Sequence, residues 1–127
     1  MNIPTNLKYT NTDEWVLVDG KTATIGVTDH AQEQLSDVVF VEITVSIGDK
    51  LAKKTTIATV ESVKAAADVN LPVSGKVVAI NEDLPQTPEL VNSDPYGKAW
   101  MIKVELDNPA ELDALMDAAG YEKHAKE

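Results

Sequence analysis

The chain has 127 residues, no cysteine and a formal net charge of −10, because eleven lysines, with no arginine, face twenty-one Asp and Glu residues. This length predicts one domain, residues 1–127, that buries its own core without a metal or a disulfide. The missing cysteines exclude thiolate catalysis, disulfides and iron–sulfur clusters, and the acidity without arginine disfavours nucleic acid and anionic lipid as partners.

The chain also lacks the apolar run of about 20 residues that a membrane span requires, so we expect a soluble protein. Its first residues have neither the charged and apolar regions of a secretion signal nor the basic amphipathic pattern of a transit peptide. We therefore expect it to stay in the compartment where it is made, with an acidic surface suited to basic partner surfaces.

The first half of the chain predicts a hairpin, a short helix and a strand. Two β-rich runs, 14–18 and 22–27, flank Asp19-Gly20, a dipeptide typical of hairpin turns. Asp29 as N-cap, with Gln32 three residues later, predicts a helix at 29–35, and His30 is expected to be exposed in its first turn. Residues 37–45 alternate with period two and are apolar on both faces, which predicts a strand near the centre of the sheet.

A second hairpin is predicted around Lys64. Residues 55–62 are rich in β-branched side chains, and after the lysine come Val69, a turn signal at 72–75 and a β run at 76–80. Lys64 is therefore expected near the hairpin tip. Val63-Lys64 contains no Asn, Asp or Gly to supply positive φ, so turn chemistry does not predict a tight primed turn there.

The last third predicts a loop, a strand and a helix. Pro85, Pro88 and Pro95 indicate a long surface loop over 81–95. Residues 100–106 alternate again as a final strand. Asn108 as N-cap, with Pro109 next, predicts a helix start. An apolar stripe at helical spacing is expected to pack on the sheet: Leu112, Leu115, Met116 and Ala119. Gly120 ends this helix or separates it from a second turn.

No catalytic residues emerge from the sequence. It has no phosphate-binding loop, no zinc-protease motif and no nucleophile elbow, and its two histidines, His30 and His124, do not suggest a metal site. A small β domain of this kind is expected to bind or carry something.

Lys64 is accessible because Ser62 and Ala65 beside it are small. A solvated lysine is the default interpretation of this spacing, and a modified lysine is the alternative.

Motifs around that lysine and along the chain carry a family resemblance. Residues 61–65 (ESVKA), followed by Asp68-Val69 and by 72–75 (PVSG), resemble the lipoyl-attachment region of the glycine cleavage H-protein family. Other motifs, before and after this region, also resemble the family and occur in the same order: 14–16 (EWV), 24–32 (TIGVTDHAQ), 39–42 (VFVE), 88–92 (PELVN), 94–97 (DPYG) and 100–103 (WMIK). The resemblance covers nearly the whole chain. It departs at Asp13, where histidine is usual, and at Ser36, where glycine is usual.

The resemblance implies a fold and a site. The fold is mainly β, a lipoyl/biotinyl-type barrel-sandwich hybrid with a short helix near 29–35 and a C-terminal helical segment. Lys64 would bear lipoic acid through an amide, which removes the lysine charge. Glu14 would line the groove of the arm. The residues expected to flank the attachment turn are Glu61, Ser62, Val63 and Ala65.

The resemblance also implies a role in glycine cleavage. Lipoyl-Lys64 would take the aminomethyl group of glycine from the P protein, a PLP-dependent decarboxylase, to the T protein, an aminomethyltransferase. It would then pass electrons to the L protein, dihydrolipoamide dehydrogenase. A lipoate ligase or a lipoyl/octanoyl transferase would attach the cofactor. The chain itself would be a non-catalytic monomer in the bacterial cytoplasm, or in the mitochondrial matrix only if a transit peptide has been removed.

Three alternatives stay open at this point. The first is another lipoyl or biotinyl carrier domain, which is disfavoured by the residues on either side of the lysine. Biotinyl sites usually have Met-Lys-Met, and the lipoyl domains of 2-oxo-acid dehydrogenases usually have Asp-Lys-Ala. This chain has Val63-Lys64-Ala65. An H-like protein that serves mainly as a lipoyl donor in lipoate relay has nearly the same sequence features. A stand-alone acidic enzyme is the third, although no residues for it are found.

Overall fold

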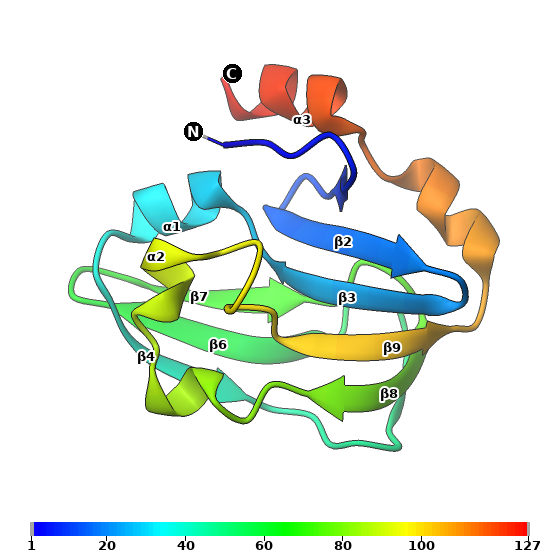
Figure 1. The fold of residues 1–127 in the computed structure, drawn as a ribbon, viewed down its shortest axis with the longest axis horizontal. Helices are drawn as coiled ribbons and strands as arrows, with labels where there is room; N and C mark the ends of the chain where they lie inside the picture. Colours follow the sequence, from blue (N-terminus) through cyan, green and yellow to red (C-terminus); the bar gives the residue numbers. More distant parts are fainter. Residues whose placement is uncertain (1, 127) are drawn as a thin grey trace.

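Within residues 2–126, which the computed structural model describes, the strands form two antiparallel sheets packed against each other (Figure 1). The larger sheet has the order β1-β2-β3-β9-β8-β5 and the smaller β4-β6-β7. The strands are β1 (Lys8–Tyr9), β2 (Glu14–Asp19), β3 (Thr22–Val27), β4 (Val38–Ile43), β5 (Lys50–Leu51), β6 (Thr56–Ser62), β7 (Ala66–Asn70), β8 (Gly75–Ile80) and β9 (Ile102–Leu106). The helical segments are α1 (Asp29–Leu35), η1 (Leu84–Gln86), α2 (Leu90–Ser93), η2 (Pro109–Ala114) and α3 (Ala118–Ala125).

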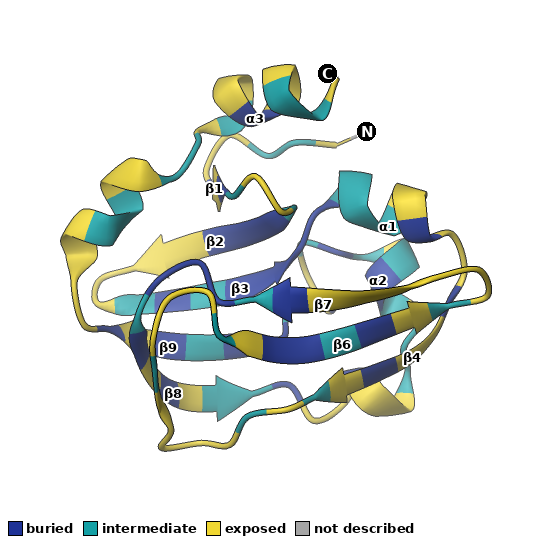
Figure 2. Ribbon diagram, turned by 180° about the vertical axis from the view of Figure 1, so that it is seen from behind, coloured by how far each residue is buried: buried dark blue, intermediate teal, exposed yellow. Residues whose placement is uncertain are grey.

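The core lies between the two sheets. Ile25 and Val104 of the larger sheet and Ile57 and Val60 of the smaller one are fully buried in the same cluster. Burying each such side chain contributes about 1.5–3 kcal/mol. Figure 2 shows buried residues along β6 and β9, whereas the loop that joins β6 to β7 is exposed. The predicted mainly β fold is confirmed. The loop between β6 and β7 lies outside the packed core, at one end of the smaller sheet.

The first predicted hairpin and helix are present, with one correction. Strands β2 and β3 pair up to Asp19 and Thr22, and Gly20 has a φ of 63°, as a tight turn requires. Helix α1 begins at Asp29, but its N-cap is Thr28, whose Oγ1 accepts from Ala31 N at 3.1 Å. Thr28 has the extended backbone of a cap, so the prediction of Asp29 was wrong by one residue.

The position predicted for the strand at 37–45 was wrong. Strand β4 lies at the edge of the smaller sheet, and β6 lies at its centre. The pairing register shifts between Val38 and Phe40, which leaves Val39 55% and Phe40 45% exposed. Val38 and Val41 are buried on the core side, so the bulge breaks the period-two pattern and two successive apolar side chains face solvent.

Residues 81–95 are not the simple surface loop that their prolines suggest. They form η1 and α2, and these short turns bury Leu84 and Val91 completely. Asn92 fastens the segment to the smaller sheet, because its Oδ1 accepts from Val38 N at 2.8 Å and its Nδ2 donates to Ser36 O at 2.7 Å. Pro85 fits the first turn of η1, where no N–H is needed.

The C-terminal segment is helical, but the single helix with an apolar stripe was a wrong prediction. Asn108 caps η2 as expected, through its Oδ1 and Ala110 N at 3.2 Å. The chain then extends at Met116, which exchanges two backbone hydrogen bonds of 2.8 Å with Tyr9, before α3 begins. Ala119 is exposed and Gly120 lies inside α3. Pairing with β1 thus outweighs helical periodicity here.

Candidate functional site: a lysine at a hairpin tip beside a groove

Lys64 lies at the tip of the hairpin formed by β6 and β7. The last pair of the ladder is Glu61 with Ala66, and the turn begins at Ser62. Ser62 N donates to Ala65 O at 2.7 Å, and Ser62 Oγ accepts from the N–H groups of Ala65, at 3.0 Å, and Lys64, at 3.3 Å. Neither Val63 nor Lys64 has positive φ. A serine side chain therefore organises the turn, with no left-handed residue, and Lys64 is exposed.

The base of this turn is fixed to the smaller sheet. Val63 N donates to Asp37 O at 3.0 Å, just before β4, although the Val63 side chain is 68% exposed. Glu61 and Ala65 are exposed on either side. The backbone is thus held in place while the lysine side chain projects freely, so an enzyme can reach the amine.

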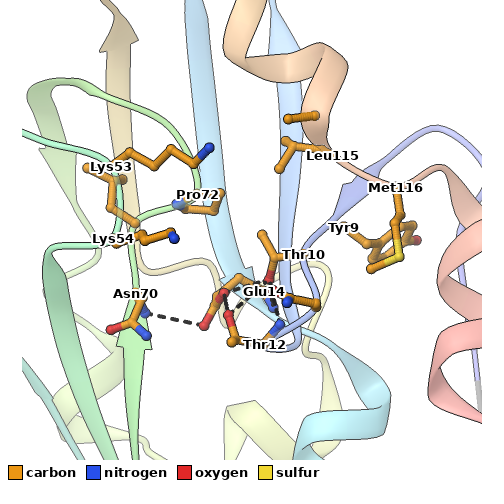
Figure 3. Close-up of a pocket in the computed structure, with 13 residues that line it drawn as sticks. Tyr9, Thr10, Thr12, Glu14, Lys53, Lys54, Asn70, Pro72, Leu115 and Met116 are labelled. Atoms are coloured by element: carbon orange, nitrogen blue, oxygen red, sulfur yellow. Dashed lines mark hydrogen bonds between the residues drawn. The ribbon is translucent and has the colours of Figure 1, made fainter. Parts of the chain in front are cut away.

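Two cavities that share Thr12 and Glu14 in their linings form a groove between the turn and the C-terminal segment. Its first part is a cavity of about 240 Å³ beside α1, and its second part is a cavity of about 540 Å³. Ala65 and Ala67 line the first part, Lys53 and Lys54 line the second, and Glu14 borders both. Figure 3 shows the second part, with the two lysines across the cavity from the C-terminal residues.

Glu14 is a buried carboxylate between the two parts of the groove. Its side chain is only 2% exposed. Its Oε1 accepts from the hydroxyls of Thr10 at 2.6 Å and Thr12 at 2.5 Å, and its Oε2 accepts from Asn70 N at 3.2 Å (Figure 3). Burial raises the pKa of Glu14, and the two threonine hydrogen bonds partly oppose that rise.

This carboxylate is suited to a positively charged or amine-bearing group. Among residues 2–126, the hydrogen bonds to Glu14 come only from neutral donors. A negative charge at a low-dielectric site interacts more strongly with a cation than it would in water. The groove can therefore hold a flexible arm along its length and bind an amine at Glu14.

Sequence reasoning singled out Lys64, Glu61, Ser62, Val63, Ala65 and Glu14. The structure brings the first five together at one turn, and Ala65 connects that turn to the groove that Glu14 borders. Thr10, Thr12 and Asn70 were missed. The two threonines lie four and two residues before Glu14, a local signal that could have suggested hydroxyl support for a carboxylate. Asn70 donates through its backbone, so its identity carries no such signal.

A two-sheet β domain that presents an exposed lysine on a hairpin, next to a groove with a buried acid, defines a carrier protein of the lipoyl or biotinyl class. Residues 7–127 match the family model described as "Glycine cleavage H-protein". The chain belongs to the glycine cleavage H-protein family. The resemblance seen in the sequence motifs is thereby confirmed.

Relatives of known name agree over almost the full length. The chain is 51% identical to a glycine cleavage system H protein of Carboxydothermus hydrogenoformans over 125 residues, which cover 98% of this chain and 95% of the relative. It is 53% identical to a mitochondrial H protein of Oryza sativa subsp. indica, over 95% of this chain and 73% of the relative. The crystal structure of a glycine cleavage system H protein from Mycobacterium marinum superimposes with a TM-score of 0.88 at 29% identity, covering 98% of this chain and 100% of that one.

Family membership decides several of the alternatives. The H protein is a non-catalytic carrier component of the glycine cleavage system, so the prediction of a carrier is confirmed and the stand-alone enzyme is ruled out. Members of this family are lipoylated, which also rules out a biotinyl domain. In residues 2–126 no helix is long and apolar enough to cross a membrane.

Proposed function

We propose that Lys64 bears lipoic acid as an amide and that this chain is the lipoyl shuttle of a glycine cleavage system. It carries the aminomethyl group of glycine from the P protein to the T protein and then delivers electrons to the L protein. One observation carries the proposal. The exposed lysine lies at a rigidly held turn, and a groove that leads to a buried carboxylate begins at the next residue, Ala65.

The residues around Lys64 fit an amide-linked lipoyl arm. Residues 65–67 are small and exposed, so a modifying enzyme meets no bulky side chain. Amide formation removes the lysine charge, which lowers the cost of laying the arm in a partly apolar groove. Val60, Val69 and Leu71 supply apolar lining there. The cofactor supplies dithiol chemistry when bound, and the protein supplies position and shielding.

Glu14 is the residue that we assign to the cargo amine. A carboxylate that accepts a hydrogen bond from a protonated amine forms a short, charge-assisted contact. The hydroxyls of Thr10 and Thr12 orient the carboxylate, and its burial keeps water away. The same contact shields the amine until the T protein opens the site.

The partners of the proposed function are the P, T and L proteins and the enzyme that attaches the cofactor, a lipoate ligase or a lipoyl/octanoyl transferase. Glu61 and Asp68 are exposed on the hairpin close to Lys64. Acidic groups there steer basic partner surfaces towards the lysine, and salt weakens that attraction. The proposal includes a monomer that acts in the bacterial cytoplasm, or in the mitochondrial matrix after removal of a transit peptide.

Intact mass and a reconstituted assay test this proposal. The protein is coexpressed with a lipoate ligase and supplied with lipoate. We expect one lipoyl adduct, which Lys64→Arg abolishes and Lys76→Arg, at an exposed lysine of β8, leaves in place. With P protein, the lipoylated form should support exchange of bicarbonate with the carboxyl group of glycine. An adduct on another lysine refutes the site assignment, and a lipoylated protein that is inactive in exchange supports lipoyl relay instead.

A further inference from the structure

Tyr121 connects the C-terminal helix to the wall of the groove. It lies in α3 and is fully buried. Its hydroxyl donates to Asp13 Oδ1 at 2.8 Å and lies 2.7 Å from Thr28 Oγ1. The Asp13 carboxylate can only accept, so the hydroxyl hydrogen of Tyr121 is donated to it. The hydroxyl of Thr28 therefore donates its own hydrogen to the Tyr121 oxygen. The three groups form one directed chain of hydrogen bonds that ends on a charge, the stronger kind of hydrogen bond.

Two further contacts lie on the same side, one with the wall itself and one with Tyr9, the residue of β1 that precedes it. The wall is the 10–13 loop, which runs from β1 to Glu14. His124 Nε2 lies 3.1 Å from Asn11 O, and the rings of Tyr9 and Tyr121 stack at 4.7 Å with an angle of 11° between their planes. The outer side of the loop thus rests on α3. Its inner side lines the groove and supplies the hydroxyls that bind Glu14.

We propose that Tyr121 is a positioning residue that holds the 10–13 loop in the shape in which Thr10 and Thr12 orient the Glu14 carboxylate. This inference rests on the proposed function of the groove as the place where the cargo is shielded. It assigns α3 a part in carrying the cargo, although the hydrogen bonds that the Glu14 carboxylate accepts come from Thr10, Thr12 and Asn70 and none comes from α3.

The backbone of the loop explains why such a restraint is needed. Asp13 has a φ of 71°, a left-handed conformation that costs a residue with a side chain about 1 kcal/mol or more. Such a conformation persists only where its surroundings impose it. Tyr121 is one such restraint, and the hydrogen bond from Thr28 N to Asp13 O at 3.0 Å is another. Removing the phenol hydroxyl leaves the carboxylate of Asp13 unheld and allows the loop to relax.

The first test measures the titration of Glu14 by carboxyl NMR in the protein without cofactor. The variant is Tyr121→Phe, which keeps the ring stack. The matched control is Tyr96→Phe, which also loses a hydroxyl with two hydrogen bonds, to Asn2 O and from Asp29 N, neither of which involves the loop. We expect the Glu14 pKa to rise in Tyr121→Phe, because the loosened threonine hydrogen bonds lower it by more than the charge of Asp13 raises it, and to stay unchanged in the control.

A second variant keeps the test decisive if Tyr121→Phe does not fold correctly. His124→Ala removes the other contact with the loop from a partly exposed side chain, and a smaller rise in the Glu14 pKa is expected. If the Glu14 pKa is the same in wild type, Tyr121→Phe and His124→Ala, the inference is wrong. Equal rises in Tyr121→Phe and Tyr96→Phe also overturn it, because they indicate general loosening of the fold.

The second test measures how long lipoylated protein keeps its cargo. Each protein is loaded from glycine by P protein and separated from it, and ammonia release into water is followed. We expect release about tenfold faster in Tyr121→Phe than in wild type or Tyr96→Phe, the effect of one lost hydrogen bond to a charged group. Equal rates in all three overturn the inference. Wild-type protein that takes no aminomethyl group from glycine refutes the proposed function instead, and the Glu14 titration still decides the inference.

Discussion

Replacing Ser36 with glycine is expected to stabilise the protein. Ser36 ends α1 with a φ of 65° and a ψ of −143°, a region that residues with a Cβ rarely adopt. Its side chain is exposed, and its backbone already accepts from Asn92 Nδ2 at 2.7 Å and donates to Gln32 O at 2.9 Å. Glycine keeps both backbone contacts and removes the steric conflict.

The expected gain follows from two opposing effects. Holding a residue with a side chain in such a conformation costs about 1–3 kcal/mol. Glycine lowers the free energy of unfolding by about 0.5–1 kcal/mol, because it makes the unfolded chain more flexible, and this offsets part of the gain. The net increase in the free energy of unfolding at Ser36→Gly is therefore about 1 kcal/mol, or about 4 °C in Tm for a chain of this size.

Urea unfolding monitored by circular dichroism measures this change. Ser36→Ala is the control, because it removes the hydroxyl but keeps the Cβ and its strain, so it should stay within about 0.5 kcal/mol of wild type. A Ser36→Gly protein that is no more stable than Ser36→Ala refutes the argument from backbone strain.

Two further predictions, one on a substitution and one on pH, concern the buried aromatic residues. Gly26→Ala should lower the free energy of unfolding by about 1–3 kcal/mol in urea titrations, since a Cβ there would lie 2.7 Å from the buried Trp15 ring, and wild-type stability would contradict the geometry. Burial raises the pKa of Tyr96 to about 12 and those of Tyr9 and Tyr121 further, so tyrosinate absorbance should not develop at the ordinary value of 10.0 while the fold persists. Because the folded state holds these protons more tightly, the free energy of unfolding should fall as pH rises from 10.0 towards 12, and a tyrosinate transition near pH 10 in folded protein would contradict this.

Local signals predicted local structure well. Asp19-Gly20 marked a hairpin, Asn108 marked a helical start, and the residues around Lys64 marked a turn, because each depends on neighbours in the chain. The errors came where distant segments decide. Val39 and Phe40 look like core residues by pattern, but the neighbours of a strand in a sheet are chosen by the whole fold, and β4 lies at an edge.

The site was predictable only in part, for the same reason. The lysine and its flanking residues are contiguous, so the motif contained them. The groove is assembled from residues far apart in sequence, such as Thr10, Asn70 and Met116, and no local pattern connects them. Asp13 and Tyr121 are separated by 108 positions, yet their contact supports the groove wall.

The turn at Lys64 makes few demands on its own sequence. Its backbone needs no glycine, and the Ser62 hydroxyl supplies the hydrogen bonds that close it. Folding therefore leaves the identities of Val63 and Lys64 almost unconstrained. The side chains at positions 63 and 64 can therefore be chosen for what binds them rather than for how the hairpin folds.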